Sequence, residues 1–498
     1  MAFVPSKYQK TVYTYIQKGK GNAVIDAVAG SGKSTTIVNA LKLIPSDKRV
    51  LFLAFNKSIV EELKIKIGNM SNVDICTLHS LGCKATLRVY KSVVNDSKYS
   101  AWLNDGMYSG FIAPEMPLSS EDKSDWKEAI SKLIDLGRVN LAHDKNQLGE
   151  IAYKHGIYPV DNELDVALRG IDWGKNNTAE IDFTDMIYLP VVKDIRMFQY
   201  DWVFIDECQD LNAAQRNLFL KCVKPNGRFV AVGDPRQAIY GFAGADVSSF
   251  NLLKAIPHTV KLPLSVCYRC DADIIQLAKE LVPQIEARDN APAGTICRDA
   301  KIADVKDGDM ILCRVSAPLV DLCMRYIGQG VKAYVKGRDV GTNLVNMIKK
   351  TKREKMTEVM ERLRRELSKI IGKEVAKTKC TQEEAMNSSA YKTYEDKLNA
   401  IEVLADGLET ATEVIDRIDA IFSDDSRSGI CLSTVHKSKG LESDNVFILC
   451  PDKFYLKRAM QIQWSAEQEA NLVYVAYTRA KHYLGFITDF VPSNENNQ

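Results

Sequence analysis

Hydrophobic residues in the first half of the chain fall into short continuous runs and not into an alternating pattern. The runs lie at residues 22–30, 49–56, 73–80, 202–207 and 228–234. Segments with apolar residues at helical spacing follow several of them, such as 33–44 ("KSTTIVNALKLI") and 57–67 ("KSIVEELKIKI"). Apolar strands that alternate with amphipathic helices are typical of a parallel sheet covered on both faces. We therefore predict an α/β core in this half.

A second series of apolar runs begins near residue 261. Its members lie at residues 260–266, 310–315, 331–337, 430–435, 445–450 and 483–490. The same pattern predicts a second α/β core. The length of 498 residues agrees with this, because a chain of that size exceeds one ordinary hydrophobic core.

Two stretches interrupt the alternation, residues 84–177 and residues 341–427. The second contains 349–375, which we expect to form one long amphipathic helix because opposite charges recur there at helical spacing. We expect both stretches to be mostly helical insertions, one in each core, although a flexible charged linker is an alternative for the second. The expected organisation is a first core at 1–83 and 178–260, a second core at 261–340 and 428–490, and a disordered tail at 491–498.

Charge and composition narrow the possible partners and compartments. The formal net charge is only +2, so a site for a polyanion must be a local groove. The chain starts without an apolar leader, and no apolar run reaches membrane-spanning length. We expect a soluble protein of a bacterial or viral-host cytoplasm, or one associated with the nucleoid, with no contact to a membrane.

The twelve cysteines are scattered, and most lie in or beside apolar runs, which indicates reduced thiols in a cytosol-like compartment. Cys267 and Cys270 have C-x-x-C spacing. A zinc site needs about four ligands, and no second pair accompanies them. We therefore expect neither metal binding nor redox chemistry there.

The segment "AVAGSGKST" (27–35) follows the first apolar run and precedes a helical pattern. Glycines in such a loop let backbone N–H groups surround phosphate oxygens, while the lysine reaches the terminal phosphates and the following hydroxyl binds Mg²⁺. Ala27 stands where the usual pattern begins with glycine. The residues expected to hold the phosphates are Ala29, Gly30, Ser31, Gly32, Lys33, Ser34 and Thr35.

The segment "VFIDECQD" (203–210) supplies an acidic pair at the end of a predicted buried strand. Ligands bind at the carboxyl ends of strands in α/β sheets. Asp206 is suited to hold Mg²⁺ together with Ser34, and Glu207 to polarise the attacking water. Together the two segments predict an enzyme that hydrolyses a nucleoside triphosphate with the help of Mg²⁺.

The ordered series of motifs resembles the UvrD/Rep/PcrA-type superfamily 1 helicases, over both predicted cores. Besides Gln9 and the segments above, it comprises 53–58 ("LAFNKS"), 77–82 ("TLHSLG"), 182–187 ("DFTDMI"), 232–246 ("VGDPRQAIYGFAGAD"), 267–270 ("CYRC"), 433–446 ("STVHKSKGLESDNV") and 474–481 ("YVAYTRAK"). The resemblance implies two RecA-like parallel-sheet cores. It also implies an ATP-dependent DNA helicase that moves 3′-to-5′ on single-stranded DNA.

The resemblance also implies roles for single residues at the nucleotide. Gln9 would read adenine, Tyr268 would stack on it, and Glu442 would contact the ribose. Gln237 would sense the γ-phosphate. Arg269 and Arg479 would reach that phosphate from the second core, where cations lower the barrier to hydrolysis.

A further group of residues would follow the DNA strand. The resemblance places Asn56, Lys57, Thr77, His79, Phe242, His436 and Lys439 there. Phe242 would stack on a base, so the turn that contains Gln237 and Phe242 would contact the nucleotide and the DNA strand at once. Purely structural roles stay open for several of these residues and for Tyr240. Tyr240 and Phe242 could be core residues, His79 a structural histidine and Lys57 a solvated charge at the start of a helix.

Other functions compete with the helicase prediction. A translocase that strips proteins from DNA while unwinding poorly is one. A nucleotide-switched DNA-binding scaffold and a small-substrate P-loop NTPase are others from different classes. The expected partners are single-stranded DNA, duplex junctions, and replication or repair proteins. The oligomeric state stays open, with a monomer expected to be competent.

Overall fold

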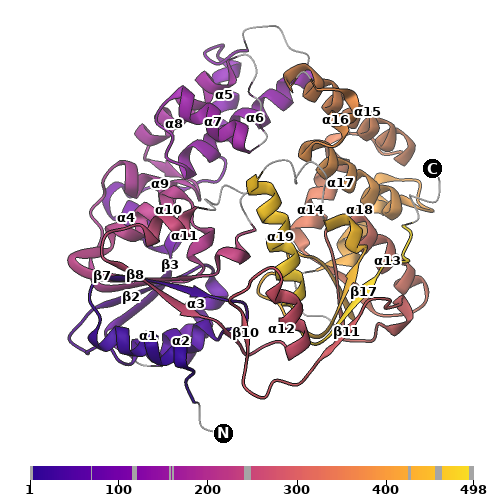
Figure 1. Ribbon diagram of the computed structural model, residues 1–498. Coiled ribbons are helices and arrows are strands. Elements are labelled where there is room, and N and C mark those ends of the chain that lie inside the picture. The colour runs from indigo at the N-terminus through magenta and orange to yellow at the C-terminus, as the bar shows by residue number, and fades with distance from the viewer. Residues whose placement is uncertain are drawn as a thin grey trace. The chain divides into compact units, whose positions relative to one another are not determined.

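Parallel strands form the centre of each of the two units into which the chain divides, Met1–Ser265 and Val266–Gln498 (Figure 1). The computed structural model describes residues 4–68, 70–114, 120–155, 157, 159, 162–239, 248–378, 380–423, 428–454 and 463–492. The fold class expected from the sequence, α/β with two parallel-sheet cores and helical insertions, is confirmed.

The first unit is built on a six-stranded sheet with the order β3-β2-β6-β7-β1-β8, in which all pairings are parallel. Its strands are β1 (Asn22–Ala27), β2 (Val50–Ala54), β3 (Val73–Thr77), β6 (Tyr200–Ile205), β7 (Val223–Gly233) and β8 (Thr259–Leu264). Within β1, Val24 packs toward one face and Ile25 toward the other. Alternate side chains thus enter two separate cores, which explains why the strands read as continuous apolar runs.

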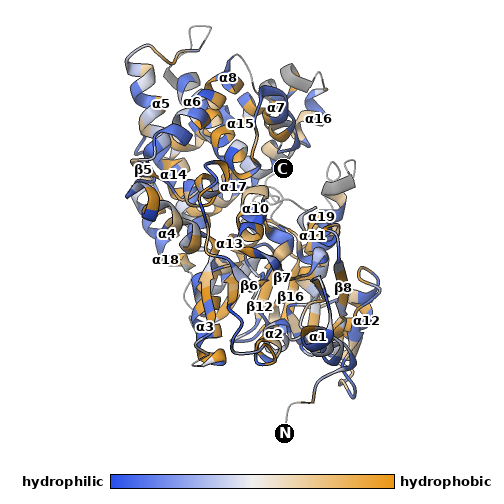
Figure 2. Ribbon diagram, turned by 90° about the vertical axis from the view of Figure 1, so that its left-hand side faces the viewer, coloured by the Kyte–Doolittle hydropathy of each residue, from blue (hydrophilic) through white to orange (hydrophobic). Residues whose placement is uncertain are grey.

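Helices cover both faces of this sheet. The core on one face includes residues of α1 (Lys7–Lys18), α2 (Lys33–Leu41) and α3 (Lys57–Ile67). The core on the other face includes residues of α4 (Leu78–Tyr90), α9 (Asp185–Val192), α10 (Ala213–Lys221) and α11 (Ser249–Lys254). In Figure 2 the strands are mostly orange, and the helices around them carry blue residues as well as orange ones.

The first insertion is helical and has a core of its own around Trp126, Ile130 and Leu133. Its helices are α5 (Lys98–Tyr108), α6 (Ser120–Val139), α7 (Lys145–Lys154) and α8 (Glu163–Asn176), drawn in purple in Figure 1. A small ladder of β4 (Val93–Val94) with β5 (Glu180–Ile181) closes its base.

A buried ionic cluster joins this insertion to α9. Arg138 of α6 places Nη1 at 2.8 Å from Asp182 Oδ1 and 2.9 Å from Asp185 Oδ1. Lys98 of α5 lies 2.6 Å from Asp185 Oδ2, and the Tyr99 hydroxyl donates to Asp185 Oδ1 at 2.8 Å. The side chains of Arg138, Lys98 and Asp185 are fully buried. Removing one partner would leave another buried charge uncompensated, so the cluster favours a single arrangement.

The second unit contains a seven-stranded parallel sheet with the order β11-β17-β16-β12-β15-β13-β14. Its strands are β11 (Thr295–Cys297), β12 (Met310–Cys313), β13 (Ala333–Lys336), β14 (Phe422–Ser423), β15 (Ile430–Thr434), β16 (Ser443–Leu449) and β17 (Ala480–Ile487). Its helices are α12 (Ala272–Lys279), α13 (Ala317–Gly328), α14 (Arg338–Lys350), α15 (Met356–Thr378), α16 (Gln382–Met386), α17 (Ser389–Ala405), α18 (Ala411–Ile421) and α19 (Gln463–Tyr477). The core against one face of the sheet includes residues of α13, α14, α15, α17 and α18.

Two boundaries differ from the expectation. The run at 260–266 was expected to open the second core, but β8 pairs with β1 over its whole length, from Asn22↔Thr259 to Ala27↔Leu264. The pattern expected as one helix over 349–375 is divided between α14 and α15, with Lys352 at a φ of 53° between them. The reason is tertiary: the Met356 N–H donates to the Glu409 carbonyl at 2.9 Å, which fixes the turn to the α17–α18 connection.

The linker alternative for residues 341–427 is wrong for the described part of that stretch, because Val359, Leu363, Leu398 and Val414 are buried in the core of the second unit. Residues 493–498 of the expected tail lie outside the described residues. A search of the described helices finds none with the length and apolarity that crossing a membrane requires.

Gly82 lies where α4 packs against α9, and a Cβ there would overlap the carbonyl oxygen of Met186. We expect Gly82→Ala to lower the free energy of unfolding by about 1–3 kcal/mol, because the helices must separate. Gly372, on an exposed position of α15, would place its Cβ in open space. Gly372→Ala should therefore raise stability by about 1 kcal/mol. Urea unfolding of both variants checks the pair, and a Gly82→Ala protein as stable as the parent would contradict the packing.

Candidate functional site

The loop between β1 and α2 is shaped by two glycines in the left-handed region. Gly30 has a φ of 65° and Gly32 a φ of 73°, and Gly32 caps α2 by accepting the Thr36 N–H at 2.9 Å. Left-handed backbone favours glycine. The predicted phosphate-binding residues, 29–35, therefore form the loop and first turn at a helix N-terminus, where backbone N–H groups lack helical partners. The buried Ser31 hydroxyl has no hydrogen-bond partner among the described residues.

Lys33 and Glu207 form an ion pair at the carboxyl edge of the first sheet. Lys33 Nζ lies 2.7 Å from Glu207 Oε1, and both side chains are largely buried. Glu207 follows β6 in the left-handed region with a φ of 51°, and its N–H donates to Asp206 Oδ1 at 2.9 Å. Burial opposes the charge on Lys33, but Glu207 and Asp206 outweigh it and raise the pKa of the lysine above its usual value. The two predicted catalytic groups are thus brought together.

Gln209 extends this pair toward the end of β7. Its side-chain amide donates to Glu207 Oε2 at 2.5 Å and accepts the Asp234 N–H at 3.1 Å. Gln237 in turn donates to Asp234 Oδ2 at 2.7 Å. Gly233 has to be small here, since a Cβ would lie 2.8 Å from Cys208 Sγ and would overlap the Gln209 amide oxygen. The sequence analysis missed Gln209, although an amide inside the acidic "DECQD" segment is a signal for it.

Asp234 is fully buried, and this burial raises its pKa to about 6, against the opposing effect of Lys33. Its carboxylate also accepts the Arg236 N–H at 3.0 Å. The predicted phosphate sensor Gln237 therefore lies within a hydrogen-bond network that runs back to Glu207. The network joins the ends of β6 and β7.

The donors proposed for Mg²⁺ fit a hard cation. Ser34 lies in the first turn of α2 and Asp206 directly after β6, and both supply oxygen ligands. Asp206 is near enough to contribute to the field on Lys33. Among the described residues, no group of three or more His, Cys, Asp or Glu side chains is arranged to hold a metal ion. Phosphate oxygens and water would have to complete the coordination of Mg²⁺.

The Gln9 side chain forms hydrogen bonds within the first unit. Its side-chain amide donates to Thr36 Oγ1 at 3.0 Å, and its carbonyl oxygen accepts the Ser6 N–H at 2.9 Å. The residue is buried, and its two hydrogen bonds link the start of α1 to α2, the helix that follows the predicted phosphate loop. Its adenine-reading role stays a prediction.

In the second unit, Arg269 and Glu442 pair with each other. Arg269 Nε lies 2.7 Å from Glu442 Oε2, and Nη1 donates to the Thr478 carbonyl at 3.0 Å. Partial burial would raise the pKa of Glu442, but Arg269 and Lys481 outweigh it and lower that pKa. Tyr268 beside them is 40% exposed, as a ring that stacks on a base requires. One residue predicted for phosphate, one for ribose and one for adenine therefore lie close together in the second unit, on the loop after β9 and the loop before β16.

Arg479 is buried, with an exposed fraction of 1%. Its Nε donates to the Val475 carbonyl at 2.9 Å and Nη1 to the Leu441 carbonyl at 3.0 Å. The guanidinium therefore links the end of α19 to residue 441. The sequence could not indicate this, since the motif that contains Arg479 fixes its position and not its hydrogen-bond partners. Its contact with a phosphate stays a prediction.

The described residues of the first unit that are predicted to bind DNA lie at the ends of the neighbouring strands β2 and β3 or just after them. Asn56 caps α3 by accepting the Ile59 N–H at 2.9 Å, and Thr77 caps α4 by accepting the Ser80 N–H at 3.1 Å. Lys57 is exposed at the first position of α3. Two helix N-termini and a cation thus lie along one sheet edge, an arrangement suited to phosphates.

Aromatic rings gather at the same edge. The His79 ring centroid lies 6.2 Å from that of Phe183, which is 58% exposed, and burial lowers the pKa of His79. Phe55 is also exposed, and it lines a small cavity together with His79 and Asp206. The sequence analysis missed Phe183. The sequence feature that could have indicated it is an aromatic residue between two acids in "DFTDMI". Both acids form ion pairs with Arg138.

In the second unit, the predicted DNA contacts follow β15. Lys437 pairs with Asp339, while His436 and Lys439 are half-buried. Burial lowers the pKa of His436 to about 3, and the charges of Arg314 and Lys437 add to this effect. Tyr240 and Phe242 lie outside the described residues.

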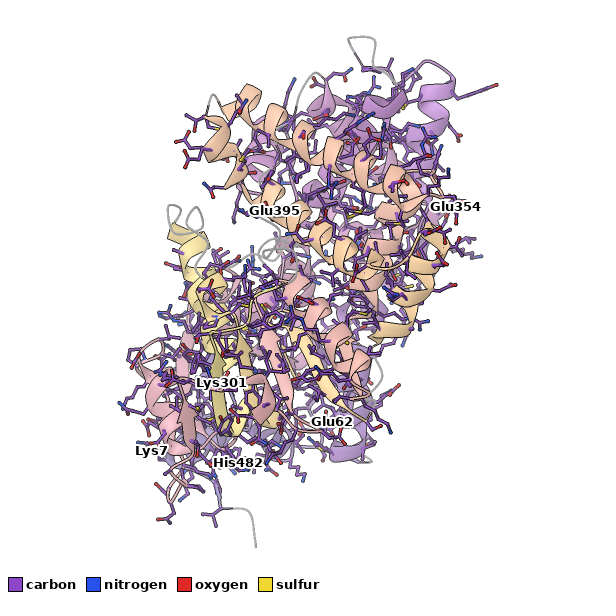
Figure 3. The ribbon with its side chains drawn as sticks, turned by 90° about the vertical axis from the view of Figure 1, so that its right-hand side faces the viewer. Lys7, Glu62, Lys301, Glu354, Glu395 and His482 are labelled. Atoms are coloured by element: carbon purple, nitrogen blue, oxygen red, sulfur yellow. The ribbon has the colours of Figure 1, made fainter. Side chains whose placement is uncertain are left out.

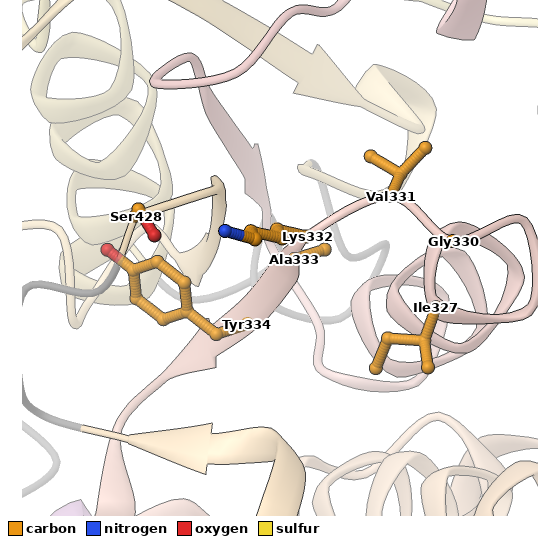
Figure 4. Close-up of a pocket in the computed structure, with 7 residues that line it drawn as sticks. All are labelled: Ile327, Gly330, Val331, Lys332, Ala333, Tyr334 and Ser428. Atoms are coloured by element: carbon orange, nitrogen blue, oxygen red, sulfur yellow. The ribbon is translucent and has the colours of Figure 1, made fainter.

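A pocket of about 360 Å³ lies at the opposite edge of the second sheet, where β13 and β15 begin (Figure 4). Its lining consists of Ile327, Gly330, Val331, Lys332, Ala333, Tyr334 and Ser428. It contains none of the residues predicted to bind nucleotide or DNA.

Comparison with known proteins finds matches in both units. A model of the UvrD/REP helicase N-terminal domain matches residues 8–257, and a model of the UvrD-like helicase C-terminal domain matches residues 319–489. A probable DNA helicase II homolog of Mycoplasma pneumoniae is 25% identical over 327 residues, 59% of this chain and 45% of that protein.

Two further relatives have similar identities. F-box DNA helicase protein 1 of Schizosaccharomyces pombe is 22% identical over 504 residues, 92% of this chain and 55% of that protein. The ATP-dependent DNA helicase Rep of Escherichia coli is 24% identical over 293 residues, 53% of this chain and 41% of that protein. The chain spans about half the length of the relatives it matches.

His436 should make the stability of the protein depend on pH. Its folded-state pKa of about 3 lies below its usual value of 6.5, so the stabilising contribution is present above pH 6.5 and is lost as the pH falls toward 3. At pH 5 the loss should reach up to about 2 kcal/mol. We expect His436→Gln to lose less stability between pH 7.5 and pH 5 than the parent in urea unfolding. Equal losses in the two proteins would contradict an imidazole that its half-buried surroundings keep neutral.

Proposed function

The chain belongs to the UvrD/Rep helicase family, and on this premise we propose that it is an ATP-driven motor that moves 3′-to-5′ on single-stranded DNA and separates duplexes. The observation that carries the proposal is the Lys33–Glu207 pair, held at the sheet edge that also exposes aromatic rings. Its partners would be single strands and duplex junctions, with replication or repair proteins that act on them. Its location would be the cytoplasm or nucleoid.

The geometry supports ATP hydrolysis at the first unit. Phosphate oxygens over the loop at 28–32 would compete with Glu207 for the Lys33 ammonium, which lies in the first turn of α2. Glu207, released from the lysine, would then orient the attacking water and accept its proton. Gln209 would keep hold of the second carboxylate oxygen and so limit the rotation of Glu207.

The charge of the terminal phosphate needs further cations. Mg²⁺, bound by Ser34 and Asp206, would neutralise charge on the phosphate oxygens. Arg269 and Arg479 are proposed to stabilise the transition state, as the family resemblance implies. For Arg479 this requires an exchange of its carbonyl contacts for a phosphate, because its guanidinium is buried.

The hydrogen-bond network from Glu207 to Gln237 supports coupling between hydrolysis and DNA. It runs through Gln209 and Asp234, and Gln237 stands three residues before segment 240–247, which contains Phe242. A movement of the Glu207 carboxylate would therefore alter the hydrogen bonds of the residues that lead into the predicted base-stacking turn. His79 and Asp206 line the same small cavity, which gives a second link between the proposed DNA path and the proposed Mg²⁺ site.

The strand path proposed for the first unit combines rings with phosphate donors. Phe55, His79 and Phe183 would stack on bases, and the N-termini of α3 and α4 with Lys57 would meet the backbone. Such binding needs no base sequence, because every base offers a π-face.

Duplexes with a 3′ or a 5′ single-stranded tail test the direction and the activity together. We expect ATP-dependent unwinding from the 3′ tail and little from the 5′ tail. Displacement of a bound protein from the same DNA, measured in parallel, would identify a motor that strips proteins but separates strands poorly. Absence of both activities would reject the motor.

Lys33→Ala and Glu207→Gln should each lower ATP hydrolysis in the presence of single-stranded DNA by ~100-fold or more, because each removes one member of the hydrolytic pair. Binding of an oligonucleotide should persist in both variants. The control is Lys42→Ala, which removes an exposed lysine just after the same helix and should leave turnover unchanged. Steady-state phosphate release checks all three, and near-normal turnover by Lys33→Ala would contradict the assignment.

Phe183→Ala should weaken binding to single-stranded DNA by ~5- to 100-fold, the loss of one stacked base. Phe198→Ala is the matched control, since Phe198 in the same unit is 61% exposed but packs on Arg88. Fluorescence anisotropy with a labelled oligonucleotide measures both affinities. Equal affinities for Phe183→Ala and Phe198→Ala would remove Phe183 from the strand path.

A further inference from the structure

A short ladder outside the main sheet of the second unit brings Arg288 to the loop that contains Arg269. The strands β9 (Val266–Cys267) and β10 (Glu286–Ala287) pair in parallel, with Val266 opposite Glu286 and Cys267 opposite Ala287. Arg288 follows this ladder directly and so lies level with Tyr268. The register of two residue pairs therefore decides where the guanidinium is placed.

Arg288 holds the backbone on both sides of Arg269. Its Nη1 donates to the Tyr268 carbonyl at 3.2 Å and to the Cys270 carbonyl at 3.1 Å. Its Nη2 lies 3.1 Å from Asp271 Oδ1. A guanidinium presents its donors in a rigid planar fork, so one side chain can fix three acceptors at once. A lysine has no such fork.

Asp271 anchors this contact to the main sheet. Its buried carboxylate accepts Arg288 on Oδ1 and lies 2.8 Å from His482 Nδ1 through Oδ2, while its N–H donates to the Lys481 carbonyl at 2.9 Å. Lys481 and His482, the latter labelled in Figure 3, belong to β17. Gly294, with a φ of +83°, packs against Asp271, and a Cβ there would lie 2.9 Å from the Asp271 Cβ. The loop is thus held from several sides.

We propose that Arg288 is a positioning residue, which fixes the backbone of residues 268–270 so that Tyr268 and Arg269 are presented in one orientation. This inference rests on the proposed function, in which these two side chains meet ATP. Arg288 itself touches neither nucleotide nor DNA in this account. It acts by holding the carbonyl groups that flank Arg269.

The consequence for catalysis follows from preorganisation. Loss of the fork leaves two carbonyls and the Asp271 carboxylate without their shared donor, and the loop gains alternative backbone conformations. A displacement of about 1 Å in a catalytic group costs on the order of 100-fold in rate. The predicted defect is therefore kinetic, and larger than a loss of stability alone would produce.

The chain contains a matched control for a purely structural effect. Arg417 in α18 also donates Nη1 to two carbonyls, those of Leu404 at 2.9 Å and Asp406 at 2.8 Å. Its contacts lie at the end of α17 and in the connection to α18, far along the chain from residues 268–270. Removing either guanidinium deletes the same kind of bond, but only Arg288 holds the loop that carries Tyr268 and Arg269.

The test compares Arg288→Met, Arg288→Lys and Arg417→Met in the full chain, at saturating single-stranded DNA. We expect Arg288→Met to raise the KM for ATP and to lower kcat/KM by ~10- to 100-fold. Arg288→Lys, which retains the charge and a single donor nitrogen in place of the planar fork, should recover part of the loss. Arg417→Met should lower Tm by about as much as Arg288→Met does. Its kcat and KM should stay within about twofold of the parent, well below the tenfold loss expected for Arg288→Met.

The inference is overturned if Arg288→Met keeps the parental kcat/KM, or if Arg417→Met shows the same kinetic loss. His482→Ala, which removes a contact to Asp271 from the exposed side, supplies a milder variant should Arg288→Met not fold, and its KM should rise in the same direction. Arg269→Ala separates the two proposals. A defect in Arg269→Ala with none in the Arg288 variants sinks the positioning role alone, whereas a parent without ATP hydrolysis sinks both.

Discussion

A positive and a negative charge are held together, largely out of water, where β1 and β6 end. Each charge alone would be costly to bury, and their mutual attraction offsets part of that cost. Lys33 occupies this place because two left-handed glycines turn the chain from strand into helix, and Glu207 because it follows β6 in the left-handed region itself. The remaining polar groups of this edge, Gln209 above all, are arranged around that pair.

The same edge would let one fold serve the proposed nucleotide and the proposed DNA strand together. In a parallel sheet, neighbouring strands end side by side, so the caps of α3 and α4 and the rings of His79 and Phe183 lie beyond β2 and β3, next to β6. The buried cluster around Arg138 holds the two acids on either side of Phe183 and leaves the ring exposed. Costly buried charges thus serve to orient one exposed side chain.

The sequence predicted the strands, the phosphate loop and the helical insertions, because each depends on local patterns. It failed where distant contacts decide. The strand 259–264 reads equally well as the start of either core, and only its pairing with β1 assigns it to the first. The turn before Met356 depends on the Glu409 carbonyl. Motif positions singled out Lys33 and Glu207, which the structure brings together. They did not indicate the buried surroundings of Arg479 and Gln9 or the contacts of Gln209, Phe183 and Arg288.

A crystal structure with Mg²⁺ and a non-hydrolysable ATP analogue tests directly whether Lys33 exchanges Glu207 for a phosphate oxygen. The account predicts that Lys33 Nζ leaves Glu207 and lies within ~3 Å of a phosphate oxygen, with the phosphates against the backbone N–H groups of the β1–α2 loop. A nucleotide bound elsewhere, while Lys33 stays paired with Glu207, would contradict it.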